Sequence, residues 1–390
     1  MTNTKQPEQS SRLLIGMFLS ATFLYWITLY LYVPTLPSYI LTKTVNLAMV
    51  GVVLSMYGLL QALIRIPVGV AVDATGTGKP FIIGGFLFGA AGALVMGLGE
   101  SLGLMTLGRA LTGLAAATWV PLVAVFSRMF PRDRVIIATS VLAFTGSIGR
   151  MLATGVNGLL NTWGGYRLAF VLAAVASAAA IVIIIFTKLE RSEPRRPSPR
   201  AIIGIVTRPD VILPTLISAV IQFASWAVSL SFLPILAQNM GAGDNIKSFL
   251  VSLNIGASTV GNLLSTVLAR RFKPSSVLFF STLLVCLGIA GTAISPSIPY
   301  LFVCMFIMGL ANGVGYPTLM GMSIQKIEPA QRNTAMGTHQ SIYAVGMFTG
   351  PWVGGIIADA VGIRVMFGIV AGAALAAAYL LILILRRAKQ

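Results

Sequence analysis

Apolar residues form twelve long segments along the chain, separated by short polar stretches. The segments fall near residues 13–40, 47–72, 80–99, 102–126, 136–160, 166–187, 211–237, 248–269, 276–295, 299–324, 335–358 and 364–385. An α-helix of about 20 apolar residues crosses a bilayer. Proline and glycine inside several segments are tolerated in membrane bundles. The pattern predicts an all-α polytopic membrane protein with twelve transmembrane helices.

One of the gaps differs from the others in length and composition. The stretch from Lys188 to Asp210 is rich in charge and proline, and it divides the twelve segments into six and six. We therefore expect a tail at 1–12, a six-helix bundle at 13–187, a linker at 188–210, a second six-helix bundle at 211–385 and a tail at 386–390.

The two groups of six segments are related in sequence. Four residues of the first group recur 197 residues later, and two more recur 196 residues later: Gly158, Gly165, Arg167 and Phe170 match Gly355, Gly362, Arg364 and Phe367, while Gly113 and Pro121 match Gly309 and Pro317. Two independent matches at nearly one offset indicate duplication of a six-helix unit. Two such pseudo-repeats with a site at their interface are one plan for a transporter.

Basic residues are distributed unequally between the two sides of the predicted membrane. With the N-terminus inside, twenty Lys and Arg residues fall on the cytoplasmic side and only four outside, Lys43, Arg167, Lys247 and Arg364. Cytoplasmic loops carry such an excess of Lys and Arg. We expect both termini and the linker to be cytoplasmic, in the cell membrane.

Composition excludes several classes of protein. The chain is 56% hydrophobic and only 9% charged, whereas soluble domains carry about 25% charged residues. The net charge of +17 does not indicate nucleic-acid binding, because most basic residues lie in short gaps between apolar segments. Cys286 and Cys304 have no disulfide or metal spacing. No nucleotide-binding loop or nucleophile constellation is present, so we expect no enzyme, cofactor or metal.

Three arginines lie inside the apolar segments, where each charge costs roughly 2.5–3.5 kcal/mol. Arg109 and Arg150 fall at similar depth in the fourth and fifth segments, and no acid lies at that depth. We hypothesise that both face a central cavity and bind a negative charge on the substrate. Alternatively, Arg109 snorkels to the surface and Arg150 bonds to carbonyls or water. Arg65 is expected to anchor its helix end or to pair with Asp73.

Further polar and aromatic residues inside the segments are candidates for lining the cavity. They are Tyr30, Tyr57, Gln61, Gln222, Trp226, Asn254, Asn262, Asn312, Tyr316, Gln340 and Tyr343. Each has the alternative role of a hydrogen bond between packed helices. His339 is the single histidine, and it is a candidate for proton coupling because imidazole titrates near neutral pH. An interfacial position is its alternative.

The gap after the second segment carries a recognisable motif. GVAVDATGTGKP, from Gly69 to Pro80, resembles the signature loop of the major facilitator superfamily. Gly69, Asp73 and Gly76 match, and Lys79 remains from the basic run. Ala74, Thr77 and Gly78 stand where basic residues are usual. The resemblance covers the whole chain and implies that this loop helps to gate the transporter.

Two further motifs resemble those of drug:proton antiporters in this superfamily. Arg109-x-x-x-Gly113 resembles the motif of helix four, whose arginine is implicated in proton coupling. The Gly-Pro-x-x-Gly-Gly motif of helix five is degraded at residues 153–158. It is intact in the eleventh segment as Gly350, Pro351, Gly354 and Gly355, where flexing at Gly-Pro makes mechanical sense.

The combined interpretation is a secondary active transporter that moves a small organic molecule by alternating access. The resemblance implies proton-coupled efflux. The alternative is uptake or exchange of a small organic anion, with Arg109 and Arg150 binding its negative charge. A sensor that transports nothing is a rival of another class. The expected partners are the substrate, protons and the lipid bilayer, and we expect a monomer.

Overall fold

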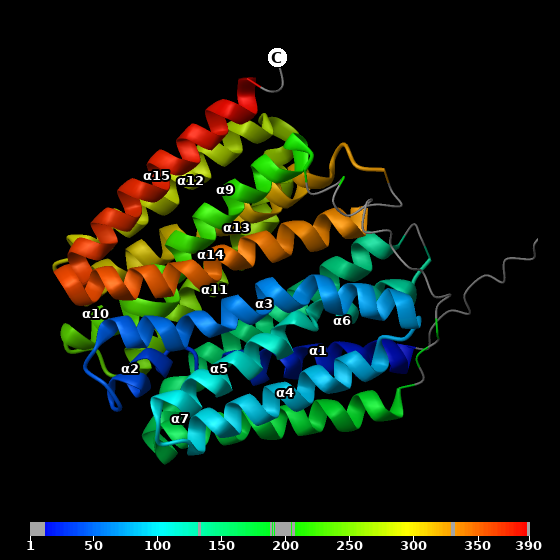
Figure 1. Ribbon diagram of the computed structural model, residues 1–390, viewed down its shortest axis with the longest axis horizontal. Helices are drawn as coiled ribbons and strands as arrows, with labels where there is room; N and C mark the ends of the chain where they lie inside the picture. Colours follow the sequence, from blue (N-terminus) through cyan, green and yellow to red (C-terminus); the bar gives the residue numbers. More distant parts are fainter. Residues whose placement is uncertain are drawn as a thin grey trace, which may run out of the picture.

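The computed structural model is built of helices throughout the part of the chain that it describes (Figure 1). It describes residues 12–131, 134–187, 207–328 and 332–387, together with residues 189, 191 and 204. The predicted tails, apart from residues 12, 386 and 387, and most of the predicted linker lie outside these residues.

The described residues of the first half form seven helical pieces, which correspond to six membrane crossings. They are α1 (Arg12–Tyr30), α2 (Leu36–Leu41), α3 (Leu47–Thr75), α4 (Lys79–Leu98), α5 (Leu102–Ala117), α6 (Trp119–Arg128) and α7 (Val135–Phe186). The segment predicted at 13–40 is interrupted after Tyr30, where Pro34 and Pro37 provide no backbone N–H for a continuous helix. The fourth crossing is divided between α5 and α6 at Thr118.

Helix α7 contains two crossings joined by a kink. Its 52 residues would span about 78 Å at 1.5 Å per residue, far more than the roughly 30 Å of a hydrocarbon core. Gly164 and Gly165 depart from helical geometry, and Gly165 has a φ of +64°, a conformation that glycine adopts without strain. The kink corresponds to the predicted gap between 160 and 166.

The second half repeats this order. It consists of α9 (Pro209–Ser225), the π-helix η1 (Trp226–Phe232), α10 (Leu233–Asn239), α11 (Asp244–Arg271), α12 (Pro274–Ala293), α13 (Ile298–Ile324), α14 (Arg332–Val361) and α15 (Ile363–Arg387). The first three pieces form one crossing. Among the described residues, eleven helices are long and apolar enough to span a membrane; with α7 counted as two, the twelve predicted crossings are present.

Equivalent arginines contact equivalent turns in the two halves. Arg167, just after the kink in α7, lies 3.8 Å from Glu100 in the turn between α4 and α5. Its counterpart Arg364 donates to the carbonyls of Ala293, at the end of α12, and Ser295, in the turn before α13. The repeat detected in the sequence is therefore a repeat of structure.

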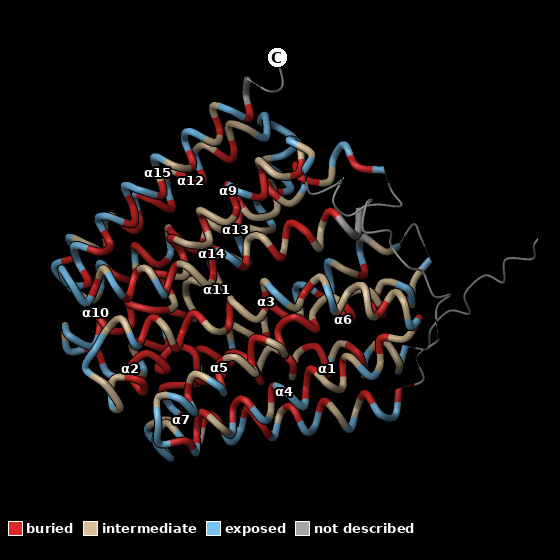
Figure 2. Tube along the Cα trace, viewed as in Figure 1, coloured by how far each residue is buried: buried red, intermediate tan, exposed pale blue. Residues whose placement is uncertain are grey.

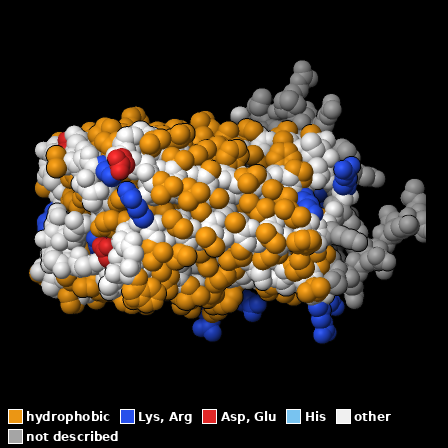
Figure 3. All heavy atoms as spheres, turned by 90° about the horizontal axis from the view of Figure 1, so that it is seen from below, with side chains coloured by type: hydrophobic (Ala, Val, Ile, Leu, Met, Phe, Trp, Pro, Cys, Tyr) orange, Lys and Arg blue, Asp and Glu red, His pale blue; other side chains and the backbone are white. Residues whose placement is uncertain are grey.

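The two halves lie side by side, with α3 packed on α14 and α7 packed on α11 (Figure 1). Exposed positions recur along the outer helices (Figure 2), and many of the exposed side chains are apolar. Figure 3 shows a broad hydrophobic surface on one face of the molecule, as a lipid-facing bundle requires. We call the end where α7 finishes and α9 begins the linker end. The opposite end, with the turns after α2 and α14, is called the far end.

Candidate functional site

A cavity of about 280 Å³ lies between the two halves. Its wall comes from α1, α3, α5, α6 and α7 of the first half and from α9, η1, α11, α13 and α14 of the second. Ten of the predicted substrate-binding residues line it: Tyr30, Tyr57, Gln61, Arg150, Gln222, Trp226, Asn254, Asn312, Tyr316 and Tyr343. Asn262 and Gln340 line it as well. Their proposed contact with substrate remains a prediction.

The wall also contains residues that were not among the predicted cavity residues. They include Trp26, Trp119, Ser147, Ser258 and Thr259, and also Arg65, for which a role at the helix end was expected. A periodic signal was present for two of them. Arg65 follows Tyr57 and Gln61 at four-residue intervals, and Trp26 lies four residues before Tyr30, spacings that place side chains on one helix face.

Arg150 lies on the aromatic wall of the first half. Its guanidinium carbon is 4.6 Å from the ring centroid of Trp26 and 5.9 Å from that of Tyr30, within the range of a cation–π interaction. One amino group donates to Ser147 Oγ at 3.1 Å. The Nε atom is buried without a hydrogen-bond partner. Arg150 therefore keeps an unused donor beside the cavity.

Arg65 connects the two halves, and the prediction that it pairs with Asp73 is wrong. It donates to Tyr343 Oη at 3.1 Å and to the carbonyl of Gln340 at 3.4 Å. Asp73 instead lies 3.5 Å from Arg128. Eight residues separate Arg65 from Asp73 on one helix, a rise of about 12 Å. Like Arg150, Arg65 has a buried Nε with no partner.

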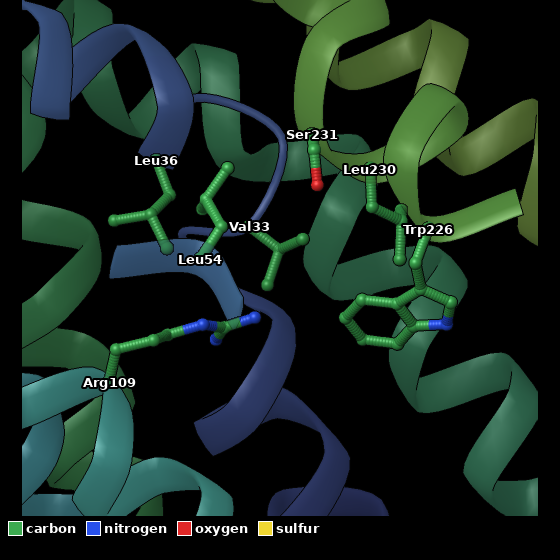
Figure 4. A pocket seen from close by; sticks show the side chains of 7 residues that line it. All are labelled: Val33, Leu36, Leu54, Arg109, Trp226, Leu230 and Ser231. Carbon is green, nitrogen blue, oxygen red and sulfur yellow. The ribbon is translucent and has the colours of Figure 1, made fainter. Parts of the chain in front are cut away.

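Arg109 does not line the central cavity. It lies in a narrow adjoining space with Val33, Leu36, Leu54, Trp226, Leu230 and Ser231, and its guanidinium points toward the side of Trp226 (Figure 4). Its guanidinium carbon is 4.3 Å from the ring centroid of Tyr57, which in turn stacks on Trp226 at 5.4 Å. With 2% of its surface exposed, Arg109 does not snorkel. Trp226 borders both spaces.

His339 is buried between helices, beside the cavity wall. Its Nδ1 lies 3.1 Å from Thr215 Oγ1 on α9, and its ring is 6.2 Å from that of Tyr316. The Nε2 atom has no partner. Both roles proposed for His339, proton coupling and an interfacial position, stay predictions.

Glycines close the halves against each other between the cavity and the far end. A Cβ on Gly51 would collide with the carbonyl oxygen of Pro351, and one on Gly58 would collide with the backbone of Met347 and Phe348. The motif from Gly350 to Gly355 contacts both halves, because Gly350 packs on α9 while Gly355 packs on Gly51. In this conformation its role is close helix packing, as small residues permit in membranes.

A polar cluster adds to this closure at the far end. Lys247 is almost fully buried and contacts Asp244 Oδ1 at 2.6 Å, Ser38 Oγ at 2.8 Å and Gln238 Oε1 at 3.2 Å. Asn161 donates to Asp244 Oδ2 at 2.8 Å. Ser38 and Asn161 belong to the first half, and Asp244 and Lys247 to the second. We call these four residues the far-end latch.

A family model described as Major Facilitator Superfamily matches residues 18–214 and again residues 215–390. The chain belongs to the major facilitator superfamily. The two matches correspond to the two structural halves. Members of this superfamily are membrane transporters, so the chain is a multi-pass integral membrane transporter and not an enzyme.

Relatives of the chain include proteins named for multidrug efflux and for multidrug resistance. The chain is 26% identical over 148 residues to the multi-drug resistance efflux pump PmrA of Streptococcus pneumoniae, a stretch that covers 37% of either protein. It is 25% identical over 291 residues to the multidrug resistance protein MdtG of Citrobacter koseri, covering 72% of this chain and 71% of MdtG.

The fold is also that of solved transporters. A bacterial homologue of the human lysosomal transporter Spinster, in an inward-facing and unoccupied conformation, superposes with a TM-score of 0.77 at 16% identity. The match covers 97% of this chain and 96% of that one. The prediction of a two-repeat major facilitator fold is confirmed.

The superfamily's signature loop makes its contacts within the first half. Gly76 ends α3 with a φ of +67°, which suits glycine. Lys79 Nζ donates to the carbonyls of Ile185 and Thr187 at 2.7 and 2.8 Å, so it caps the end of α7. Gly69 has room for a Cβ in ordinary contact with Val120. Gating by this loop is a prediction about another conformation.

Replacing Asp73 by asparagine should slow transport severalfold without unfolding the protein. Asp73 and Arg128 are each more than 40% exposed, and such ion pairs contribute about 0–1 kcal/mol. The thermal midpoint should thus stay near that of the parent, and substrate affinity should stay within a few-fold. Initial flux and equilibrium binding in the same preparation check this. An unchanged turnover would remove Asp73 from gating.

Proposed function

We propose that the chain exports a small organic molecule across the cell membrane by alternating access, in exchange for protons. The observation that carries the proposal is the cavity between the two halves, closed toward the far end by glycine packing and by the far-end latch. The similarity to proteins named for multidrug resistance and efflux supports export.

The membrane orientation proposed from the charge bias determines which side of the membrane this conformation is closed to. If both termini are cytoplasmic, the far end faces outward and the closed contacts of α3 with α14 form the outer gate. The cavity is then loaded from the cytoplasm. Opening requires Gly51 and Gly58 to separate from α14 while the halves approach at the linker end, which is a rocking motion of two rigid bundles.

Proton coupling is proposed to involve Arg109 and His339. A guanidinium stays charged, so Arg109 is proposed to act on its surroundings: it lies over Tyr57, whose ring also lines the cavity. A change in the hydration of Arg109 would alter the positions of Tyr57 and Trp226, and through them the binding of substrate. His339 is proposed as a group that titrates, next to the cavity residue Tyr316.

The alternative is uptake or exchange of an organic anion bound jointly by Arg109 and Arg150. It has one observation in its favour, because Arg150 lines the cavity and no carboxylate does among the described residues. Joint binding does not suit this conformation, since Arg109 lies in the separate space of Figure 4. The positive charge of the cavity wall is evidence about the charge of the substrate, and it is not evidence about the direction of transport.

Flux measurements in proteoliposomes of known orientation test the proposal. Thr207→Cys, in a background with Cys286→Ala and Cys304→Ala, reports by thiol labelling which side the linker end faces. In vesicles with the linker end outside and an acidic lumen, fluorescent organic dyes should accumulate severalfold above the level without a gradient. A protonophore should abolish this. Accumulation only with the opposite gradient indicates uptake, and no flux of any dye contradicts transport.

A further inference from the structure

The walls that the two halves contribute to the cavity correspond position by position. With one repeat offset for each helix, 196 or 197 residues, eight pairs of lining residues are related: Trp26 and Gln222, Tyr30 and Trp226, Tyr57 and Asn254, Gln61 and Ser258, Arg65 and Asn262, Ala116 and Asn312, Ala143 and Gln340, and Arg150 and Met347. Duplication thus produced a cavity with matched walls, and the differences within pairs show how the two walls diverged.

The divergence concerns charge. Both arginines that line the cavity belong to the first half, and their partners in the second half are the neutral residues Asn262 and Met347. The second half instead supplies uncharged amides, from Gln222, Asn254, Asn262, Asn312 and Gln340. No Asp or Glu lines the cavity among the described residues. One wall is therefore cationic and the other is polar but neutral.

The cationic wall has unused capacity for hydrogen bonding. Arg65 is 97% buried, and its Nε has no partner, as is also the case for Nε of Arg150. The hydrogen bonds that these two guanidinium groups do make go to the neutral groups of Tyr343, Gln340 and Ser147. A buried charge is stable only when it is paired or hydrated. A planar guanidinium fork is suited to carboxylate, sulfonate or phosphate oxygens.

We infer that the transported molecule is an aromatic organic anion, bound with its anionic group against the first half at Arg65 and Arg150. Its uncharged end faces the amides of the second half. The rings of Trp26, Tyr30, Tyr57, Trp119, Trp226 and Tyr316 supply surfaces for stacking. A volume of about 280 Å³ fits a molecule of one or two rings. This inference rests on the proposed function and names its substrate class.

Binding of three probes of one shape tests the substrate class. The probes are naphthalene-2-sulfonate, the neutral naphthalene-2-sulfonamide and the cationic 2-naphthylmethylammonium, measured by quenching of tryptophan fluorescence in detergent. The parent should bind the sulfonate at least tenfold more tightly than the sulfonamide and bind the cation most weakly. Equal affinities for the three probes would overturn the inference.

The substitutions that test the two arginines are taken from the matched positions of the second half. Arg65→Asn and Arg150→Met each install the residue of the matched position, and each should weaken sulfonate binding roughly ten- to a hundred-fold while sulfonamide binding stays within threefold. Arg167→Asn removes an exposed charge outside the cavity and should change neither. If Arg65→Asn fails to fold because its contact with Tyr343 is lost, Arg150→Met decides. Weakening of both probes alike by Arg150→Met would overturn the inference.

Moving the charge between walls tests the orientation of the ligand. Arg65→Asn combined with Asn262→Arg keeps the net charge of the cavity but places the cation on the second half. Sulfonate binding should remain at least tenfold below the parent, and recovery to within threefold would overturn the assignment to the first half. Transport separates the two proposals. Pumping of cationic and neutral dyes without preference for the sulfonate refutes this inference alone, whereas absence of all flux refutes the proposed function.

Discussion

Replacing Gly51 by alanine is expected to force the two halves apart at the far end. The added Cβ would meet the carbonyl oxygen of Pro351 and the Cα of Gly355, and these are backbone atoms that cannot turn aside as a flexible side chain can. Overpacking of this kind costs about 1–3 kcal/mol. The cost applies only while α3 and α14 are in contact, so the open arrangement gains roughly five- to a hundred-fold in population.

Distances between spin labels measure this opening. Val45, in the turn after α2, is 94% exposed, and Val361, at the end of α14, is 49% exposed; the two belong to different halves. In the Gly51→Ala protein, the distance distribution between labels at Val45→Cys and Val361→Cys should shift to longer values, and transport should fall at least tenfold. Gly84→Ala is the matched control, since a Cβ at Gly84 meets nothing within 4 Å.

Gly51→Ala must also be shown to fold before its distances are interpreted. Monomeric elution and a thermal midpoint near that of Gly84→Ala establish this. An unchanged distance distribution in a folded Gly51→Ala protein would show that α14 absorbs the methyl group locally. The closure would then rest on contacts other than the Gly51–Gly355 packing.

Neutralising Asp244 is expected to open the far end as well, for an electrostatic reason. In Asp244→Asn the ammonium group of Lys247 would stay buried with only neutral partners, Ser38 and Gln238. Removing one partner of a buried ion pair costs about 3–5 kcal/mol, and we expect about 2–3 kcal/mol because the Asp244 side chain is 25% exposed. In an open arrangement water reaches Lys247 and the cost disappears.

A second substitution separates this effect from simple loss of a contact. Lys247→Met removes the cation, and the partly exposed Asp244 then remains hydrated, so the far end should open less than in Asp244→Asn. The double variant Asp244→Asn with Lys247→Met should recover toward the parent distance between Val45 and Val361. If the double variant is as open as Asp244→Asn alone, the buried charge is not the cause of opening.

The fold could be predicted from the sequence because each helix that crosses the bilayer needs an apolar segment of about the same length. Segment length gave the crossings, and the recurrence of Arg167 as Arg364 gave the repeat, which the structure shows at equivalent loops. The interruptions at Pro34 and Thr118 and the π-helix η1 were not predicted. Each of these features lies within one apolar segment and adds no polar gap, so the hydropathy pattern does not reveal it.

The sequence predicted which residues line the cavity better than it predicted how their side chains are arranged. Charged and amide side chains are costly inside apolar segments, and five of those predicted do meet around one cavity, together with five predicted aromatic residues. Depth along a helix did not reveal which face a side chain occupies. Arg109 and Arg150 were predicted at similar depth and on the same cavity, yet Arg109 lies in the space of Figure 4. The far-end latch joins residues more than 80 positions apart, such as Asn161 and Asp244. The pattern of neighbouring residues in the sequence does not predict contacts at such a separation.

The kink at Gly164 and Gly165 has a consequence for how the protein is made. Only these two residues leave helical geometry between the fifth and sixth crossings, so there is almost no polar loop to carry across the bilayer during synthesis. The two crossings are therefore expected to enter the membrane together, as a preformed hairpin, rather than one after the other. At Gly165 the positive φ makes the turn itself depend on the absence of a side chain. A substitution of Gly165 would thus impair insertion of the protein into the membrane, before any transport cycle begins.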